Sequence, residues 1–504
     1  VTENWFDLNA SRYTASSTLQ RMELLKTGYM GTLSLGWDNY LFLELTGRQE
    51  RSSTLKDQSF FYPSANLSFL FSNAFRMPAW WNHGKLRLSY GVVGNAPETY
   101  AANIIYEQGS DNGFTWNYVP SSWGNANIRP EKKYEYEIGF ESKFLNNRLG
   151  FDVSYYNNRV KDQILSTPQP STSGVKYVLM NVGEVANEGW DISVSATPVL
   201  TKNFRWDLTA NYGIYRNKVV KLADGVPYLE ISNIGGGGAK IQAVEGRPMG
   251  DIYVQVPQMN ENGEYLVSDK GLYMNQTELQ RVGNINPDGV GGLFSSFSYK
   301  NIFLDFSIDF RIGGDVINEM YQYSTASGLT PESLQFRDTE HGGLSYYYPG
   351  NNNASGVPVQ VDPSLGAGPN GETVYHDGVI LPGVVASTGE KNTRIIPAGY
   401  YYNQTYNWGT QPEQLTYRHS VFDNSYVKLR ELTIGYQFPE KLISKLGMTR
   451  LSVSVFGRNL FYFYKALKNY DAESSVGTSW ASQAVVGGST TATRNFGVSL
   501  RASF

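Results

Sequence analysis

The final stretch of the chain, Asn495–Phe504 with the sequence NFGVSLRASF, decides the fold. Every second residue is apolar and the residues between are polar or glycine: Phe496, Val498, Leu500, Ala502 and Phe504 alternate with Asn495, Gly497, Ser499, Arg501 and Ser503. Period-two alternation predicts a β-strand with one apolar and one polar face. Strands of about ten residues with an apolar side toward lipid and a polar side toward water build outer-membrane barrels.

The same alternation recurs upstream, for example at Leu86–Tyr90, Tyr134–Phe140, Leu304–Phe310 and Leu451–Val455. We therefore predict an all-β fold, a transmembrane antiparallel β-barrel, with about 14 strands from this chain. Their expected centres lie near residues 8, 30, 45, 67, 90, 138, 154, 191, 211, 295, 307, 431, 456 and 498.

Connection lengths separate a barrel from a water-soluble β-sandwich, which would also alternate. Short links are expected near residues 38–39, 146–147, 199–203, 300–301 and 439–449. Long excursions are expected near residues 95–131, 160–186, 217–290, 313–424 and 463–492. Short and long connections thus alternate, which is typical of tight periplasmic turns and long extracellular loops.

Composition agrees with a bacterial outer-membrane location. Aromatic residues make up 14% of the chain, with 36 Tyr and 25 Phe, and such rings favour the membrane–water interface. A net charge of −4 disfavours a nucleic-acid partner. Cysteine is absent, which excludes disulfides and thiolate metal sites.

An open sheet edge in lipid is not tolerated, because each unpaired backbone group costs several kcal/mol. A strand of about ten residues would leave about five N–H and five C=O groups without partners. Either the first and last strands pair with each other, or another polypeptide completes the wall.

Several segments, taken in order over the last part of the chain, carry a family resemblance. They are Val282–Gly292 (VGNINPDGVGG), Asp309–Asn318 (DFRIGGDVIN), Ser425–Pro439 (SYVKLRELTIGYQFP), Val453–Phe461 (VSVFGRNLF), the pair Tyr470 and Asp471, and Arg494–Phe504. Together they resemble the SusC/RagA family of TonB-dependent outer-membrane transporters.

The resemblance implies a barrel of about 22 strands, an N-terminal plug, a segment that contacts TonB, and a SusD-like surface lipoprotein that lids the outer face. On this resemblance, residues 1–504 are the C-terminal portion of the barrel. A second polypeptide would carry the plug and the remaining strands, and further surface lipoproteins and outer-membrane lipid are possible partners.

Aromatic clusters in the long excursions are candidates for contact with cargo, because flat amphipathic rings suit sugar faces and peptide side chains. We select Trp116, Tyr118, Trp123, Tyr347, Tyr401 and Trp408. The alternative interpretation is that these rings pack the loops together or meet the lid.

Charged residues on the polar side of the strands should point into the lumen. Asp305, Asp309 and Arg311 share one strand and are expected to face a plug, or otherwise to form a hydrated wall. Glu135, Glu137 and Glu141 are interpreted in the same way.

No catalytic or metal-binding pattern is present. The four histidines are isolated, no GxSxG elbow occurs, and Asn260–Glu264 lacks the spacing of a calcium loop and is interpreted as a turn. We predict a protein that is not an enzyme and has no cofactor and no metal site.

The sequence favours active import of a bulky nutrient through a SusCD-type complex energised by TonB, with oligosaccharide ahead of oligopeptide. The alternatives are a passive porin closed by this chain alone, or a structural or assembly platform whose loops bind proteins.

Overall fold

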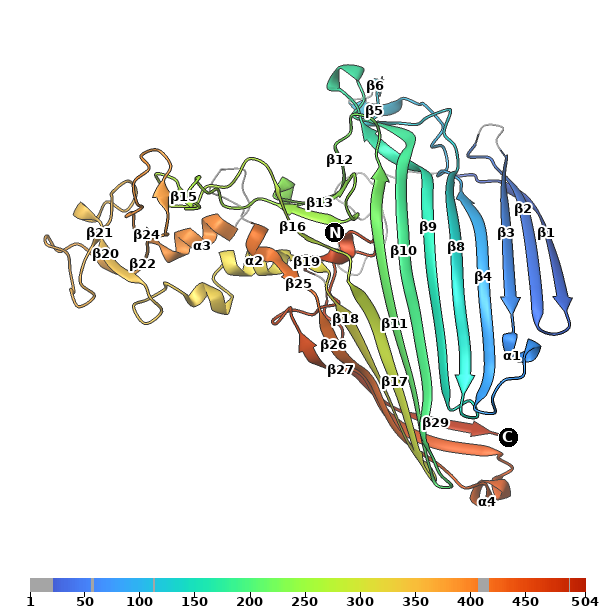
Figure 1. Cartoon of the computed structure of the whole chain (residues 1–504). Helices are drawn as coiled ribbons and strands as arrows, with labels where there is room; N and C mark the ends of the chain where they lie inside the picture. The colour runs from blue at the N-terminus through green and yellow to red at the C-terminus, as the bar shows by residue number, and fades with distance from the viewer. Residues whose placement is uncertain (1–20, 56–58, 112–113, 407–416, 489) are drawn as a thin grey trace.

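The computed structural model describes residues 21–55, 59–111, 114–406, 417–488 and 490–504. One large sheet dominates these residues, and Figure 1 shows its strands side by side from β1 in blue to β29 in red. Its antiparallel path runs through β1 (Lys26–Trp37), β2 (Leu41–Ser52), β3 (Ser59–Phe69), β4 (Trp81–Asn95), β8 (Glu131–Phe144), β9 (Leu149–Pro168), β10 (Tyr177–Leu200), β11 (Phe204–Lys221), β17 (Gly289–Tyr299), β18 (Ile302–Ile312), β26 (Tyr426–Gln437), β27 (Arg450–Lys465) and β29 (Asn495–Ser503). The short strand β7 (Ser122–Trp123) joins β10 in parallel.

The expected strand centres from residue 30 onward all fall inside strands of this path. The centre near residue 8 lies outside the described residues. The range 160–186, expected as a long excursion, is instead mostly strand. β9 and β10 continue to pair through it and leave only residues 169–176 as the connection. Period-two reading missed this because Asn, Lys and Gln interrupt the alternation there.

Apolar side chains stand in register across the sheet, as the alternation predicts. Leu35 lies opposite Leu43, Leu43 opposite Leu67, and the row continues through Leu88 and Ile138. At the other edge Val498, Val455, Ile434 and Leu304 form a matching row. None of these side chains is buried. Leu43, Leu67 and Leu304 are half-buried and the others are exposed (Ile138 is 50% and Val498 71% accessible), so the apolar face is continuous and open. Such a surface suits lipid, not water.

Short turns gather at one rim of the sheet, the lower rim in Figure 1. Asn146 and Asn147 have positive φ angles of 58° and 63°, which asparagine tolerates better than most residues. Two short helices, α1 (Phe71–Ala74) and α4 (Glu440–Ile443), also lie in connections at this rim. These turns fix the strand register at the side expected to face the periplasm.

Aromatic rings cluster near this rim. Trp80 stacks on Trp81 and on Phe144, and Trp206 stacks on Phe297. From Trp81 to Tyr90, β4 advances about 30 Å at about 3.3 Å per residue. With a typical tilt of about 40°, that length spans about 23 Å across the membrane, close to the apolar band of outer-membrane barrels.

The long excursions at the opposite rim carry their own small sheets. These contain β5 (Glu107–Asp111) and β6 (Phe114–Tyr118); β12 (Tyr228–Ile234), β13 (Ala239–Val244), β14 (Asp251–Val254) and β16 (Gln280–Asn284); β15 (Leu266–Val267) and β23 (Val384–Val385); β20 (Leu344–Tyr347), β21 (Val359–Gln360), β22 (Val374–Val379) and β24 (Ile396–Pro397); and β19 (Asp315–Asn318), β25 (Val421–Asp423) and β28 (Val485–Val486). Asn260 closes a turn through its side chain, which accepts from the backbone N–H of Glu264 at 2.9 Å, as interpreted from the sequence.

Helices are few. α2 (Glu319–Ala326) and α3 (Ala398–Tyr406) pack in the excursion that extends to the left in Figure 1. Single 3-10 turns span Ser171–Ser173, Gly235–Gly237, Pro331–Leu334, Pro349–Asn351, Tyr417–Ser420, Ser444–Leu446 and Ser482–Ala484. Among the described residues, no helix has both the length and the apolarity needed to cross a bilayer.

Three excursions share one apolar core. Ile241 and Ile252 come from the connection between β11 and β17, Ile317 and Tyr417 from that between β18 and β26, and Val485 from that between β27 and β29. All five are buried. The excursions therefore form one packed unit on the outer rim rather than separate loops.

The two edges of the large sheet do not pair with each other within the described residues. β1 pairs with β2 alone, and β29 pairs with β27 alone. Closure of the wall by β1 and β29 is not found in this part of the chain, and the strand expected near residue 8 lies outside it.

Candidate functional site

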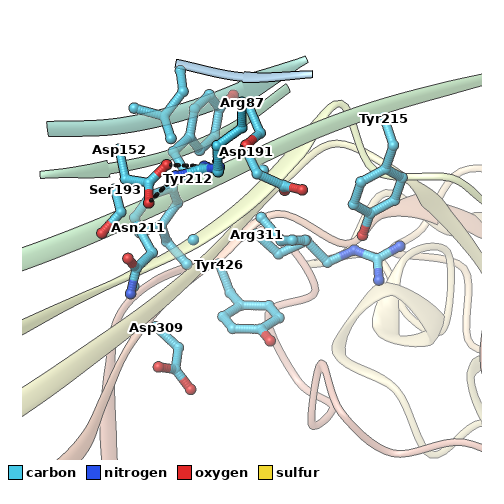
Figure 2. Close-up of a pocket in the computed structure, with 17 residues that line it drawn as sticks. Arg87, Asp152, Asp191, Ser193, Asn211, Tyr212, Tyr215, Asp309, Arg311 and Tyr426 are labelled. Atoms are coloured by element: carbon cyan, nitrogen blue, oxygen red, sulfur yellow. Dashed lines mark hydrogen bonds and ion pairs between the residues drawn. The ribbon is translucent and has the colours of Figure 1, made fainter. Parts of the chain in front are cut away.

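The polar face of the sheet encloses a hollow of about 800 Å³. Its lining comes from strands β4, β9, β10, β11, β17, β18 and β26, and Figure 2 shows the polar side chains that project into it. They include Arg87, Asp152, Asp191, Asn211, Tyr215, Asp309, Arg311 and Tyr426. This is the water-facing side of the barrel wall.

Arg87 organises one side of the hollow. Its guanidinium donates to Asp152 at 2.6 Å and to Ser154 at 3.1 Å, and it lies 3.4 Å from Glu141. The dashed lines in Figure 2 mark its bonds to Asp152. Because one arginine serves two carboxylates from neighbouring strands, it ties β4, β8 and β9 together on the inner face.

A second hollow of about 730 Å³ adjoins the first and shares Asp191 and Tyr215 with it. A row of amide side chains crosses its floor. Asn187 donates to Asn158 at 2.8 Å, and Asn158 donates to Glu135 at 3.0 Å. Glu135 also pairs with Lys133 at 2.6 Å. Thus the acidic candidates Glu135 and Glu141 are held by neighbours on the wall, while Glu137 lines the second hollow.

The predicted inward residues of β18 separate into different environments. Asp305 accepts from Ser296 at 2.6 Å, and Asp309 accepts from Nε of Arg430 at 2.5 Å. Arg311 donates to the backbone carbonyl of Ile285 at 3.0 Å. Only Asp309 and Arg311 of these three line the first hollow. A contact of these residues with a plug stays a prediction.

The segments that carried the family resemblance meet at one junction at the outer end of the wall. Arg430 bonds to Asp309 at 2.5 Å, to Asn459 at 2.9 Å, and to both carboxylate oxygens of Glu473 at 2.5 and 2.9 Å. Lys428 also donates to Glu473 at 2.5 Å. Sequence reasoning missed this cluster, although four of its five residues stand in the quoted segments and the fifth, Glu473, lies two residues beyond Asp471.

Asp471, like Glu473, lies in the connection between β27 and β29 and anchors it through separate hydrogen bonds. It accepts from the hydroxyl of Tyr462 at 2.6 Å and from the backbone N–H groups of Glu473 and Ala492. The ammonium of Lys428 lies over the ring of Tyr462, 4.8 Å from its centroid. Burial alone would raise the pKa of Asp471, but these hydrogen bonds outweigh it and hold the pKa below its usual value.

Neighbouring contacts bind the remaining segments. Ser425 accepts from the N–H of Gly313 at 2.8 Å, Asp315 accepts from the N–H of Asn284 at 3.0 Å, and Asn424 donates to the carbonyl of Ala472 at 3.0 Å. Gly313 and Gly314 have φ angles of 68° and 79°, a conformation that suits glycine. The segments are therefore a structural joint between wall and excursions.

Two of the aromatic candidates lie on an exposed hairpin. Trp116 and Tyr118 belong to β6, and their side chains are 47% and 44% accessible. Trp123 belongs to β7, beside β10, and its indole N–H is buried without a hydrogen-bond partner. These three residues come from one excursion, and Figure 1 shows its strand β6 apart from β20 and α3.

The other aromatic candidates lie in the excursion between β18 and β26. Tyr347 is half-buried beside the fully buried Tyr346. Tyr401 packs against Tyr402, with ring centroids 4.9 Å apart, and burial raises its pKa above the usual value. Trp408 lies outside the described residues. Much of this aromatic cluster thus packs the core of its own excursion; contact with cargo stays a prediction.

The comparisons with known proteins agree with this geometry. The family model described as TonB dependent receptor-like, beta-barrel matches residues 4–252. TonB-dependent receptor P3 of Formosa agariphila is 22% identical over 89% of this chain and 42% of its own length. TonB-dependent receptor SusC of Bacteroides thetaiotaomicron is 27% identical over 44% of this chain and 24% of its own length. The chain spans less than half of the length of these curated relatives.

A solved structure of the RagAB peptide transporter matches the whole chain with a TM-score of 0.71, at 19% identity and over 50% of that chain. With the continuous apolar face and the polar hollow, these matches define the class of protein: an outer-membrane β-barrel. Within that class, residues 4–252 are similar to the barrel of TonB-dependent receptors, and the resemblance of the chain to the SusC/RagA family is confirmed.

Proposed function

We propose that this chain supplies part of the barrel of an active importer for a bulky nutrient, energised through TonB and lidded by a SusD-like surface lipoprotein. The observation that carries the proposal is the polar inner face, which holds adjoining hollows of about 800 and 730 Å³ beneath the packed excursions. Binding, enclosure and release need such a surface. No covalent chemistry is proposed, since family members are receptors rather than enzymes.

The wall needs further strands. Within the described residues, the outer edges of β1 and β29 have no strand partner, and an edge left open in lipid costs several kcal/mol for each unpaired backbone group. We propose that polypeptide outside residues 1–504 supplies these strands and the plug. The passive-porin alternative requires the first and last strands of the chain to close on each other, and within the described residues β29 pairs with β27 alone.

Cargo is proposed to be an oligosaccharide first and an oligopeptide second. The exposed rings of Trp116 and Tyr118 support contact with a flat sugar face. The burial of Tyr346 and Tyr402 removes part of the aromatic argument, since those rings pack against protein. The likeness to the RagAB peptide transporter supports an oligopeptide as the second candidate cargo.

Uptake in cells tests the proposal. Cells that make the full transporter take up fluorescent oligosaccharides or oligopeptides only while TonB is present. Replacing both Trp116 and Tyr118 by alanine lowers uptake at least fivefold, whereas replacing Tyr228, an exposed ring on another excursion, leaves it unchanged. Uptake that persists without TonB would instead identify a passive pore. Loops that bind partner proteins while neither cargo enters would favour the platform alternative.

A further inference from the structure

The connection between β27 and β29 is bound to the inner wall at one end and to the outer excursions at the other. We call residues 466–488 the strap. We infer that Arg430 is the positioning residue that holds the strap against the lumen wall, with Glu473 as its counterpart. The consequence for import rests on the proposed function, but the holding role does not.

A bulge places Arg430 for this role. Against β18, Ile308 meets Leu429 and Ser307 meets Glu431, so Arg430 is an extra residue on its strand. Against β27, Leu429 lies opposite Phe461 and Glu431 opposite Arg458, so the ladder leaves Arg430 unpaired and facing Asn459 and Leu460. A bulge re-aims side chains, and here two consecutive residues, Arg430 and Glu431, turn to the inner face. On the facing strand, Asn459 adopts a φ of 53° and is not paired with Arg430 in the strand register. Its side-chain oxygen instead accepts a hydrogen bond from the guanidinium of Arg430.

The planar guanidinium then bridges three parts of the chain. It reaches Asp309 on β18, Asn459 on β27 and Glu473 on the strap. Lys428 adds a second cation to Glu473, with only 3% of its side chain accessible. A charge so enclosed needs its partner, because an unpaired buried ion is costly. Loss of Glu473 would therefore leave Lys428 without this ion-pair partner and Arg430 with Asp309 alone.

The far end of the strap joins the outer unit. β28 pairs with β19, and Ala481, Ala484 and Val485 lie in the core that the three excursions share. Asp309 and Tyr426, which contact Arg430 and Glu473 respectively, also line the first hollow. The strap thus connects the wall of the hollow to the packed excursions, and Arg430 fixes its position.

Cysteine accessibility tests this role in outer-membrane vesicles that hold the full protein. No cysteine occurs in residues 1–504, so each single substitution gives the one thiol label within these residues. Ala472→Cys places a thiol at a buried strap position, and Thr478→Cys places one at an exposed strap position that measures the amount of protein. We expect Glu473→Ala and Arg430→Ala each to raise the maleimide labelling rate at residue 472 at least fivefold.

Conservative variants and a matched control sharpen the test. Arg430→Lys keeps the charge, but lysine has no planar fork to bridge three acceptors. This variant should therefore raise the labelling rate at residue 472 by most of the amount expected for Arg430→Ala. Glu473→Gln keeps the side-chain size and replaces the alanine variant if that one does not reach the membrane. Glu431→Ala breaks the neighbouring pair with Arg458, at 3.0 Å, which does not touch the strap, and should leave labelling unchanged.

Unchanged labelling at residue 472 in both the Glu473 and Arg430 variants would overturn the inference, as would an equal increase in Glu431→Ala. Cargo uptake is measured on the same variants. A strap that opens in a protein whose wild type imports nothing would leave the inference standing and remove the proposed function.

Discussion

At the scale of single residues, the inner wall depends on positions without a side chain. Gly189 on β10 lies between Tyr156 and Tyr215 of the neighbouring strands. A Cβ at this position would lie 2.5 Å from the ring of Tyr156 and 2.6 Å from the carbonyl oxygen of Ile214. Glycine there lets the phenol ring lie flat on the sheet and keeps the second hollow open.

Gly189→Ala should therefore lower the stability of the barrel by about 1–3 kcal/mol, since backbone cannot move aside cheaply. Gly31→Ala is the control, because a Cβ there meets nothing within 4 Å. For both variants, the stability of the barrel is measured as the denaturant concentration at which the heat-modifiable gel migration of the folded barrel is lost. Equal midpoints for the two would contradict the close approach at Gly189.

The strap carboxylates predict a pH dependence. Burial would raise the pKa of Glu473, but hydrogen bonds from Arg430 and Lys428 outweigh it and place the pKa below its usual value, as for Asp471. A lowered folded-state pKa stabilises the strap at pH values above the ordinary carboxyl pKa of about 4 and less as the pH falls below it.

Hydrogen exchange of strap peptides, corrected for intrinsic rates, checks this. We expect protection to be full at neutral pH and to fall below a pH of about 4. Glu473→Gln should show weaker protection at neutral pH and a shallower acid dependence. Identical pH profiles for the variant and the wild type would show that the carboxylate of Glu473 does not cause the pH dependence of strap protection.

At the scale of elements, the lipid-facing rows set the cost of a misplaced charge. Leu86 lies between Phe69 and Phe140 on the apolar face, and Ser89 of the same strand lies on the polar face opposite Glu137. Leu86→Arg should destabilise the barrel by about 2–4 kcal/mol, as charges near the bilayer midplane do. Ser89→Arg should stay within about 0.5 kcal/mol. Folding titrations into lipid vesicles measure both; equal costs would mean that the faces are misassigned.

The hairpin between β8 and β9 makes a second element-scale prediction. Leu145, Asn146 and Asn147 all have positive φ angles. Asn147→Val should cost about 1–2 kcal/mol, because a β-branched side chain clashes in this conformation. Asn147→Gly should be neutral or stabilising. The same unfolding assay separates them, and a tolerated valine would argue for a different turn.

At the scale of the whole molecule, the open edges decide what the chain can do alone. We expect residues 1–504, reconstituted without further polypeptide, to form no steady pore in a planar bilayer. β1 offers 12 residues of strand and, among the described residues, pairs on one side only, which leaves a costly edge if it faces lipid. Addition of the remaining strands and plug should give stable insertion. A steady conductance from the lone chain would restore the passive-porin alternative.

The sequence predicted the wall because lipid on one side and water on the other force a period of two, as in Asn495–Phe504. It failed where that constraint ends. Arg430 lies at a bulge, which breaks the period, and its partner Glu473 follows on a connection with no period at all. Tyr402 could not be separated from a ligand-binding ring, because a flat amphipathic side chain suits a packed core and a cargo surface equally.

The shared core of the excursions also constrains biogenesis. Ile241 and Ile252 are synthesised early, yet the core that buries them is completed by Val485, near the end of the chain. Those apolar side chains therefore stay unburied during secretion until the last strands arrive. Periplasmic chaperones would have to shield them, and the excursions can pack into one unit only after the wall beneath them has been inserted.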